Sequence, residues 1–80
     1  MTSTELAKLL SDAALAHRAS KDDQTLAQLE SLARQAAEHV RRVGQGTVDH
    51  IVLSSVLKLI VADAPTVKEV LDREGWRWSR

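Results

Sequence analysis

Residues 26–43 read LAQLESLARQAAEHVRRV, and the spacing of their apolar side chains decides what kind of fold this chain can adopt. The apolar positions recur in steps of three and four, which is typical of a helix that packs along one seam. They are Leu26, Leu29, Ala33, Ala36, Val40 and Val43. The other faces carry polar residues, namely Gln28, Gln35, Glu38, Arg41 and Arg42. The pattern predicts a bundle helix over residues 22–43.

Both ends of this helix carry stop and start signals. Before it, the stretch SKDDQ offers several N-cap side chains, and Asp22 and Asp23 complement the positive end of the helix dipole. At the other end, Arg41 and Arg42 lie in the last turn, where the dipole favours cations. Gly44 follows them and is expected to end the helix as a left-handed C-cap.

An earlier segment also has a helical pattern. Thr2 and Glu5 form an S/T-x-x-E capping box, in which each side chain is expected to satisfy a backbone amide of the other residue. Apolar positions on one face follow it, namely Leu6, Leu9, Leu10, Ala13, Ala14 and His17. We therefore expect a first helix over about residues 3–19.

The segment TVDHIVLSSVLKLIVADA, residues 47–64, is rich in Val, Ile and Leu, so a buried strand has to be weighed against a helix. Strict apolar alternation fails twice, whereas His50, Ser54 and Lys58 recur every four residues along one helical stripe. A helix over 48–63 is predicted, with this stripe facing water. Since nearly everything else is apolar, the helix should lie at the centre of the fold or contact a second copy.

A short fourth helix is predicted over residues 67–74. Thr66 and Glu69 form a second capping box after Pro65, and Gly75 should end the helix. A helix this short is unstable alone, so its apolar side chains must dock on the other helices. The sequence thus predicts one domain over residues 1–80, an all-α compact bundle of three longer helices plus a short C-terminal helix, followed by a tail at 75–80.

The composition suits such a domain and limits its partners. Of 80 residues, 44% are hydrophobic and 28% charged, and no cysteine is present to form disulfides. Eleven basic and eleven acidic side chains cancel, leaving no overall field that favours nucleic acid or membrane. Glu5 and Asp12 are unlike a signal peptide, and the apolar stretch 51–62 is too short to span a membrane. A cytoplasmic protein is expected.

The tail, GWRWSR at residues 75–80, holds the only aromatic side chains of the chain, Trp76 and Trp78. After a left-handed Gly75, Trp76 is expected to fold back onto Leu71 in a Schellman motif. In an extended tail Trp78 points the same way as Trp76. It could cover the apolar excess of the third helix, or it could form a hot spot for a partner.

Nothing in the sequence predicts a metal site, cofactor or active site. His17, His39 and His50 lie on three different helices, so no pair has the spacing of a helical metal site. The stretch GQGT lacks the lysine of a phosphate-binding loop. Asp49, His50, Ser54 and Ser55 include the residue types of a nucleophilic triad. Such a triad is disfavoured, because the adjacent Asp49 and His50 would point about 100° apart on a helix and no glycine-rich turn supplies an oxyanion hole. We therefore expect no enzyme activity.

Residues 64–76, APTVKEVLDREGW, look like the first helix and turn of a helix-turn-helix. The second helix of that motif reads DNA, and WRWSR after Gly75 is too short to form one. The resemblance therefore stops before the part that would carry the function.

The predicted function is a small protein-binding module, a homodimer that acts as a regulator or inhibitor by occupying a partner's surface, by analogy with phage and plasmid accessory proteins. The candidate binding residues are Trp76, Arg77, Trp78, Arg80, Arg41 and Arg42. The alternative is a nucleic-acid-binding accessory protein that uses the same arginines and tryptophans. Affinity that falls steeply with salt would favour the alternative.

Overall fold

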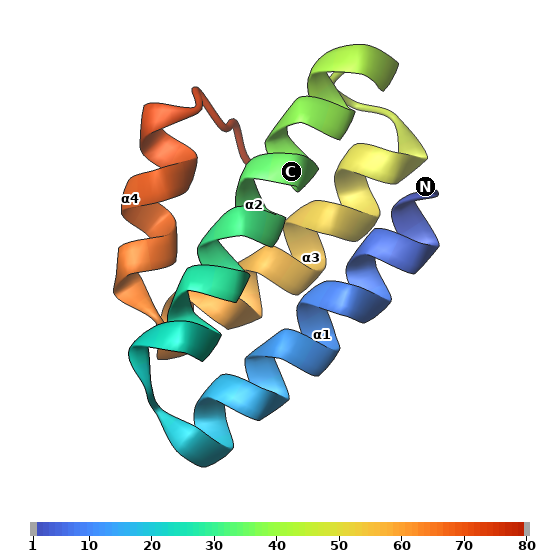
Figure 1. Cartoon of the computed structure of the whole chain (residues 1–80). Coiled ribbons are helices and arrows are strands. Elements are labelled where there is room, and N and C mark those ends of the chain that lie inside the picture. Colours follow the sequence, from blue (N-terminus) through green and yellow to red (C-terminus); the bar gives the residue numbers. More distant parts are fainter. Residues whose placement is uncertain (1, 80) are drawn as a thin grey trace.

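A computed structural model describes residues 2–79, which contain four α-helices and no strand (Figure 1). The helices are α1 (Ser3–Ser20), α2 (Asp23–Val43), α3 (Val48–Asp63) and α4 (Pro65–Arg73). The predicted all-α bundle of three longer helices and one short helix is confirmed.

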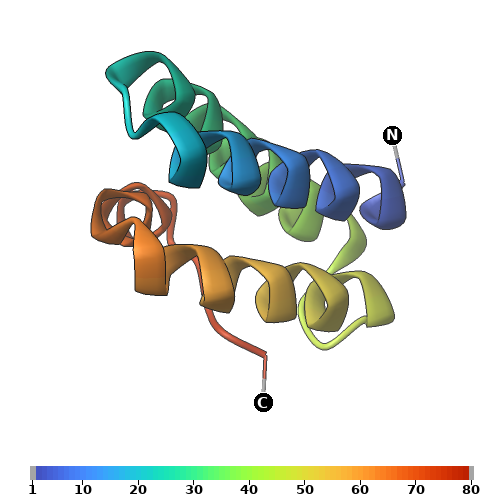
Figure 2. The ribbon, with the colours of Figure 1, turned by 90° about the horizontal axis from the view of Figure 1, so that it is seen from below.

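The three longer helices lie side by side, and α4 packs on α2 at the side away from α1 (Figure 1). Figure 2 shows that α1 and α3 are neighbours that run in the same direction. Two hydrogen bonds agree with this arrangement, because Ser3 contacts Asp49 at one end of the pair and Arg18 contacts Asp63 at the other. The tail after α4 returns along α3, on the side opposite to α1 (Figure 2).

The core is filled by small and aliphatic side chains, and α2 supplies more of it than any other helix. The predicted seam of α2 is buried at Leu29, Ala33, Ala36 and Val40. The buried face is wider than the seam, since Leu32, Ala37 and His39 are buried as well. Because α4 covers one side of α2 and α1 another, a single stripe would not fill both contacts.

One seam residue was assigned wrongly: Val43 is 41% exposed. The last turn of α2 extends beyond the N-terminal end of α1 (Figure 1), so no neighbouring helix covers this position. Periodicity predicts which side of a helix faces inward, but it does not show how far the neighbouring helices reach.

The predicted helix starts are partly confirmed. The backbone amide of Thr25 donates to the Asp22 carboxylate at 2.8 Å, as expected for an N-cap. The Thr2 hydroxyl accepts from the amide of Glu5 at 3.2 Å. In the second half of that capping box, however, the Thr2 hydroxyl also donates to the Glu5 carboxylate, so the two side chains bond to each other.

Two predicted helix boundaries, the end of α2 and the start of α4, need correction. Gly44 has a positive φ of 103°, but its ψ of 152° is not that of a left-handed helical C-cap. The capping box of Thr66 and Glu69 is absent, because α4 begins at Pro65 and places Thr66 inside the helix. Proline is well suited to this first position, since its φ is already helical and its missing N–H would have no partner there.

A hydrogen-bonded cluster joins the three longer helices at one end of the bundle. Ser3 of α1 donates to one oxygen of the Asp49 carboxylate at 2.9 Å, and His39 Nε2 of α2 donates to the other at 2.9 Å. The hydrogen bonds from His39 and from Ser3 lower the pKa of Asp49 below its ordinary value of 3.8. The ionised carboxylate of α3 thus holds α1 and α2 in register.

The α2 seam predicts a large difference between two neighbouring substitutions. Leu29→Ala should lower the free energy of unfolding by about 2–5 kcal/mol, because it removes a fully buried leucine from the core. Gln28→Ala should have almost no effect, because Gln28 is exposed. Urea unfolding followed by circular dichroism measures both. Equal losses would show that the faces of α2 are assigned wrongly.

The Asp49 cluster predicts a pH-dependent contribution to stability. Because the pKa of Asp49 is lowered by folding, its contribution is present above pH 3.8 and is lost as the pH falls below that value. Asp49→Ala should therefore lower the melting temperature at neutral pH, and the difference from the unmodified protein should shrink in acid. Asp12→Ala, at an exposed position of α1, is the control. A difference that does not change with pH would contradict the role of the carboxylate.

Candidate functional site

The side of α3 that faces away from the bundle is apolar. We define this outer face by Val48, Ile51, Val52, Ser55, Leu59 and Ala62. Val48 and Leu59 are each 74% exposed, more than any other large hydrophobic residue among residues 2–79. An outer helix of a small protein usually presents polar side chains to water. The outer face is therefore the first candidate for a binding surface.

Two of the three residues in the polar stripe predicted for α3 do not face water. His50 and Ser54, which we expected to meet water, are buried, while Lys58 is exposed as predicted. The C-terminal tail covers both buried residues and provides their hydrogen-bond partners. With His50 and Ser54 turned toward the tail, the apolar residues on the opposite side of α3 face solvent.

Two hydrogen bonds hold the tail against α3. His50 Nδ1 accepts from the backbone amide of Gly46 at 2.9 Å, so the other ring nitrogen, Nε2, donates to the carbonyl oxygen of Arg77 at 2.6 Å. The backbone amide of Ser79 donates to the Ser54 hydroxyl at 3.1 Å. Both His50 nitrogens are thus occupied in joining the α2–α3 loop, α3 and the tail. In this arrangement neither nitrogen is available as a base for Ser54.

The predicted Schellman motif at the end of α4 is confirmed. Gly75 has a φ of +76°, the amide of Gly75 donates to the Asp72 carbonyl at 3.1 Å, and the amide of Trp76 donates to the Leu71 carbonyl at 2.9 Å. This pair of bonds directs the chain back toward the bundle. It fixes where the tail begins its path along α3.

The two tryptophans lie together but differ in exposure. Their rings meet edge to face, with centroids 5.9 Å apart, and Trp76 makes a similar contact with His50 at 5.3 Å. Trp76 is partly buried against the core, whereas Trp78 is 38% exposed. Trp78 borders a surface hollow of about 590 Å³ between the tail and α3, lined also by Ile51, Ser55 and Lys58. The shared orientation predicted for the indoles agrees with this contact.

A second hollow lies between α1 and α3, on the other side of the outer face. We call it the α1–α3 groove; its volume is about 280 Å³, and its lining is mainly apolar. The lining residues are Ser11, Ala14, Leu15, Arg18, Val56, Leu59, Ile60 and Asp63. Leu15 is 62% exposed, and an ion pair between Arg18 and Asp63 closes one end of the groove.

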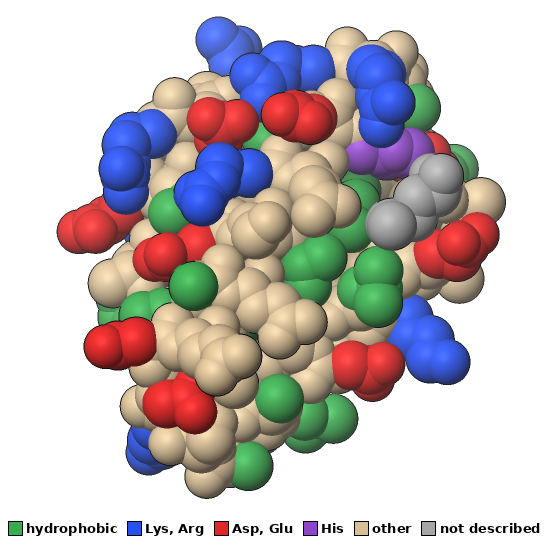
Figure 3. All heavy atoms as spheres, in the orientation of Figure 1, with side chains coloured by type: hydrophobic (Ala, Val, Ile, Leu, Met, Phe, Trp, Pro, Cys, Tyr) green, Lys and Arg blue, Asp and Glu red, His purple; other side chains and the backbone are tan. Residues whose placement is uncertain are grey.

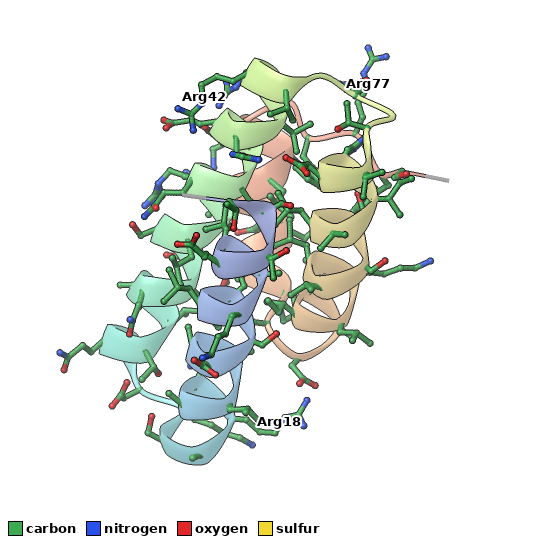
Figure 4. All side chains as sticks on the ribbon, turned by 90° about the vertical axis from the view of Figure 1, so that its right-hand side faces the viewer. Arg18, Arg42 and Arg77 are labelled. Carbon is green, nitrogen blue, oxygen red and sulfur yellow. The ribbon has the colours of Figure 1, made fainter. Side chains whose placement is uncertain are left out.

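The candidate arginines are not gathered into one basic surface. Arg41 pairs with Glu74 at 2.8 Å, which neutralises part of its charge. Figure 4 shows Arg42 and Arg77 at the same end of the molecule, each directed away from it. Figure 3 shows acidic side chains among the basic ones at the end where α2 and α4 finish. Arg80 lies outside the described residues.

Within residues 2–79, no group of three or more His, Asp or Glu side chains could hold a metal ion. His17 bonds to Thr25 beside the α1–α2 turn, His39 bonds to Asp49, and His50 bonds to the tail. None of the helices in this range has the length and apolar character needed to cross a bilayer.

The tail contacts predict different roles for the two tryptophans. Trp76→Ala should lower the free energy of unfolding by about 3 kcal/mol, because the indole packs on the core and on His50. Trp78→Ala should cost less than about 1 kcal/mol, because much of its ring is exposed. Thermal unfolding of the two variants tests this order. A larger loss for Trp78→Ala would make Trp78 part of the core.

The chain was also compared with known proteins. No protein-family model, curated protein or solved structure matches it.

Proposed function

We propose that this protein is a small non-catalytic protein-binding module whose first partner is a second copy of itself, bound through the outer face of α3. The observation that carries the proposal is the exposure of Val48, Ile51 and Leu59 along one side of one helix. A two-fold interface uses the same surface of both copies, so each copy would cover the apolar residues of the other.

The outer face has the chemistry of an interface core. Fully burying one exposed Val, Ile or Leu side chain contributes about 1.5–3 kcal/mol. The exposed parts of Val48, Ile51 and Leu59 on each copy therefore contribute toward offsetting the entropy lost on association. No charged side chain lies among the six residues that define this face. Charged residues flank it, with Lys58 on the side of the tail and Asp63 on the side of α1. An apolar centre with a charged rim is the usual composition of protein interfaces.

A regulator or inhibitor works by occupying a surface of another protein, and we propose that role, in the cytoplasm, for the homodimer. Its support is the tail, where Arg77 is exposed and directed away from the molecule (Figure 4), so it stays open to another protein when the outer faces of two copies pair. Tryptophan and arginine are the residue types most enriched at binding hot spots. The tail thus gives the dimer an arginine contact outside the outer faces that join its two copies.

A nucleic-acid-binding role has weaker support. The observation in its favour is that Arg42 and Arg77 lie at one end of the molecule (Figure 4). Against it, Arg41 is paired with Glu74. Acidic side chains also lie among the basic ones at the end of the molecule where α2 and α4 finish (Figure 3). Phosphate binding by counterion release needs several unpaired cations on one surface.

Self-association provides the test of the proposal. Light scattering at about 100 μM should give twice the mass of one chain, because micromolar affinity populates a dimer at that concentration. Leu59→Glu should give the mass of one chain with its helix content retained, because Leu59 is exposed in the isolated fold. Ala27→Glu, which adds the same charge at an exposed position of α2, should leave the dimer intact. A monomeric unmodified protein with an intact fold would overturn the proposal.

A further inference from the structure

The outer face lies between two unlike flanks. On one side the α1–α3 groove forms an apolar hollow, beside Leu15. On the other side the tail places Trp78 beside α3, with part of the indole exposed. Figure 2 shows α1 and the tail on opposite sides of α3. One flank thus offers an apolar hollow, and the other offers an aromatic side chain that could enter it.

The direction of the second α3 decides which flanks meet in a dimer. When the two helices are antiparallel, each flank meets its own copy, so α1 faces α1 and tail faces tail. When they are parallel, each flank meets the opposite one, so the tail of one copy lies along the groove of the other. The parallel pairing brings the exposed Trp78 next to the α1–α3 groove, whose lining is mainly apolar.

Resting on the proposed homodimer, we infer that its two α3 helices are parallel and that Trp78 of each copy enters the α1–α3 groove of the other. The centre of the outer face suits this pairing, since its apolar and small residues follow steps of four and three. They are Val48, Val52, Ser55, Leu59 and Ala62. In a parallel pair each of them meets its own counterpart across the two-fold axis.

The charges that border the outer face favour the same direction. Lys58, on the tail side, makes no ion pair within residues 2–79. Asp63, on the groove side, lies five residues later in the sequence. In a parallel pair, a residue on the tail side of one α3 helix faces the residue five positions later on the groove side of the other α3 helix. Lys58 of one copy therefore reaches Asp63 of the other, where it extends the ion pair of Asp63 with Arg18.

The antiparallel pairing brings like charges together. Ser3 of α1 contacts Asp49 of α3, 46 residues later, and Arg18 of α1 contacts Asp63, 45 residues later. With the same separation, Lys8 of α1 lies beside residues 53 and 54, near the middle of α3. Lys8 precedes Ser11 and Leu15 of the groove by three and seven residues and therefore shares their side of α1. Two antiparallel copies would place their Lys8 side chains near each other at the two-fold axis, where they repel.

Disulfide crosslinking distinguishes the two directions, because the chain has no native cysteine. In parallel helices residue 48 faces residue 48, so a Val48→Cys variant should form a covalent dimer on mild oxidation. In antiparallel helices residue 48 faces a residue three turns away, about 16 Å along the helix, too far for a disulfide between two identical positions. Ala27→Cys, off the outer face, controls for random collision.

The outcomes separate this inference from the proposed homodimer. Rapid crosslinking of Val48→Cys supports the parallel arrangement. A non-covalent dimer whose Val48→Cys variant links no faster than Ala27→Cys overturns the arrangement and leaves the homodimer standing. A chain that stays monomeric overturns both.

A second readout follows Trp78 itself. In a Trp76→Phe variant Trp78 is the only indole, and acrylamide should quench it at least about twofold less in the dimer than in the monomeric Leu59→Glu background. Leu15→Glu places a charge in the groove, so it should weaken dimerisation at least about tenfold. Equal quenching in dimer and monomer would show that Trp78 does not enter the groove.

Discussion

The rest of the structure depends on the close contacts of α2. Ala33 and Ala36 are fully buried on its inner side, and Ala37 is nearly so. Small side chains let neighbouring helices approach closely, which a core without Phe or Tyr requires, because few large rings are present to fill the space between them. With seven buried residues, α2 contributes more to the core than α1, α3 or α4, while its outer side is exposed to solvent. The very apolar α3 leaves Val48, Ile51 and Leu59 exposed on its outer face.

Much of the fold could be predicted because its signals are local. The N-caps Thr2 and Asp22, the spacing of the α2 seam, and the pair of Gly75 and Trp76 each depend on a few neighbouring residues. Local errors occurred where two signals competed, as at Pro65 and Thr66, where the proline and not the capping side chain began the helix. Lys21 ends α1 in the left-handed region, with a φ of 51°, and no glycine marks that position in the sequence.

The candidate site could be predicted only in part, because it depends on contacts between distant residues. The tryptophans were singled out from the sequence, and the apolar excess of α3 was recognised. The prediction of which side of α3 faces solvent was wrong. The tail returns across residues 50 and 54 and supplies polar partners that periodicity cannot anticipate. The α1–α3 groove was not foreseen, because Leu15 is a single leucine outside the apolar stripe of its helix.

The contact between the tail and α3 has a consequence for how the chain tolerates change. His50 bonds to the carbonyl oxygen of Arg77, and Ser54 bonds to the amide of Ser79, so α3 recognises the main chain of the tail. Main-chain groups are the same for almost every amino acid. Sequence variation can therefore alter the side chains at positions 77 and 79 without detaching the segment. The chemistry that this edge presents to other molecules can change while the path of the chain is kept.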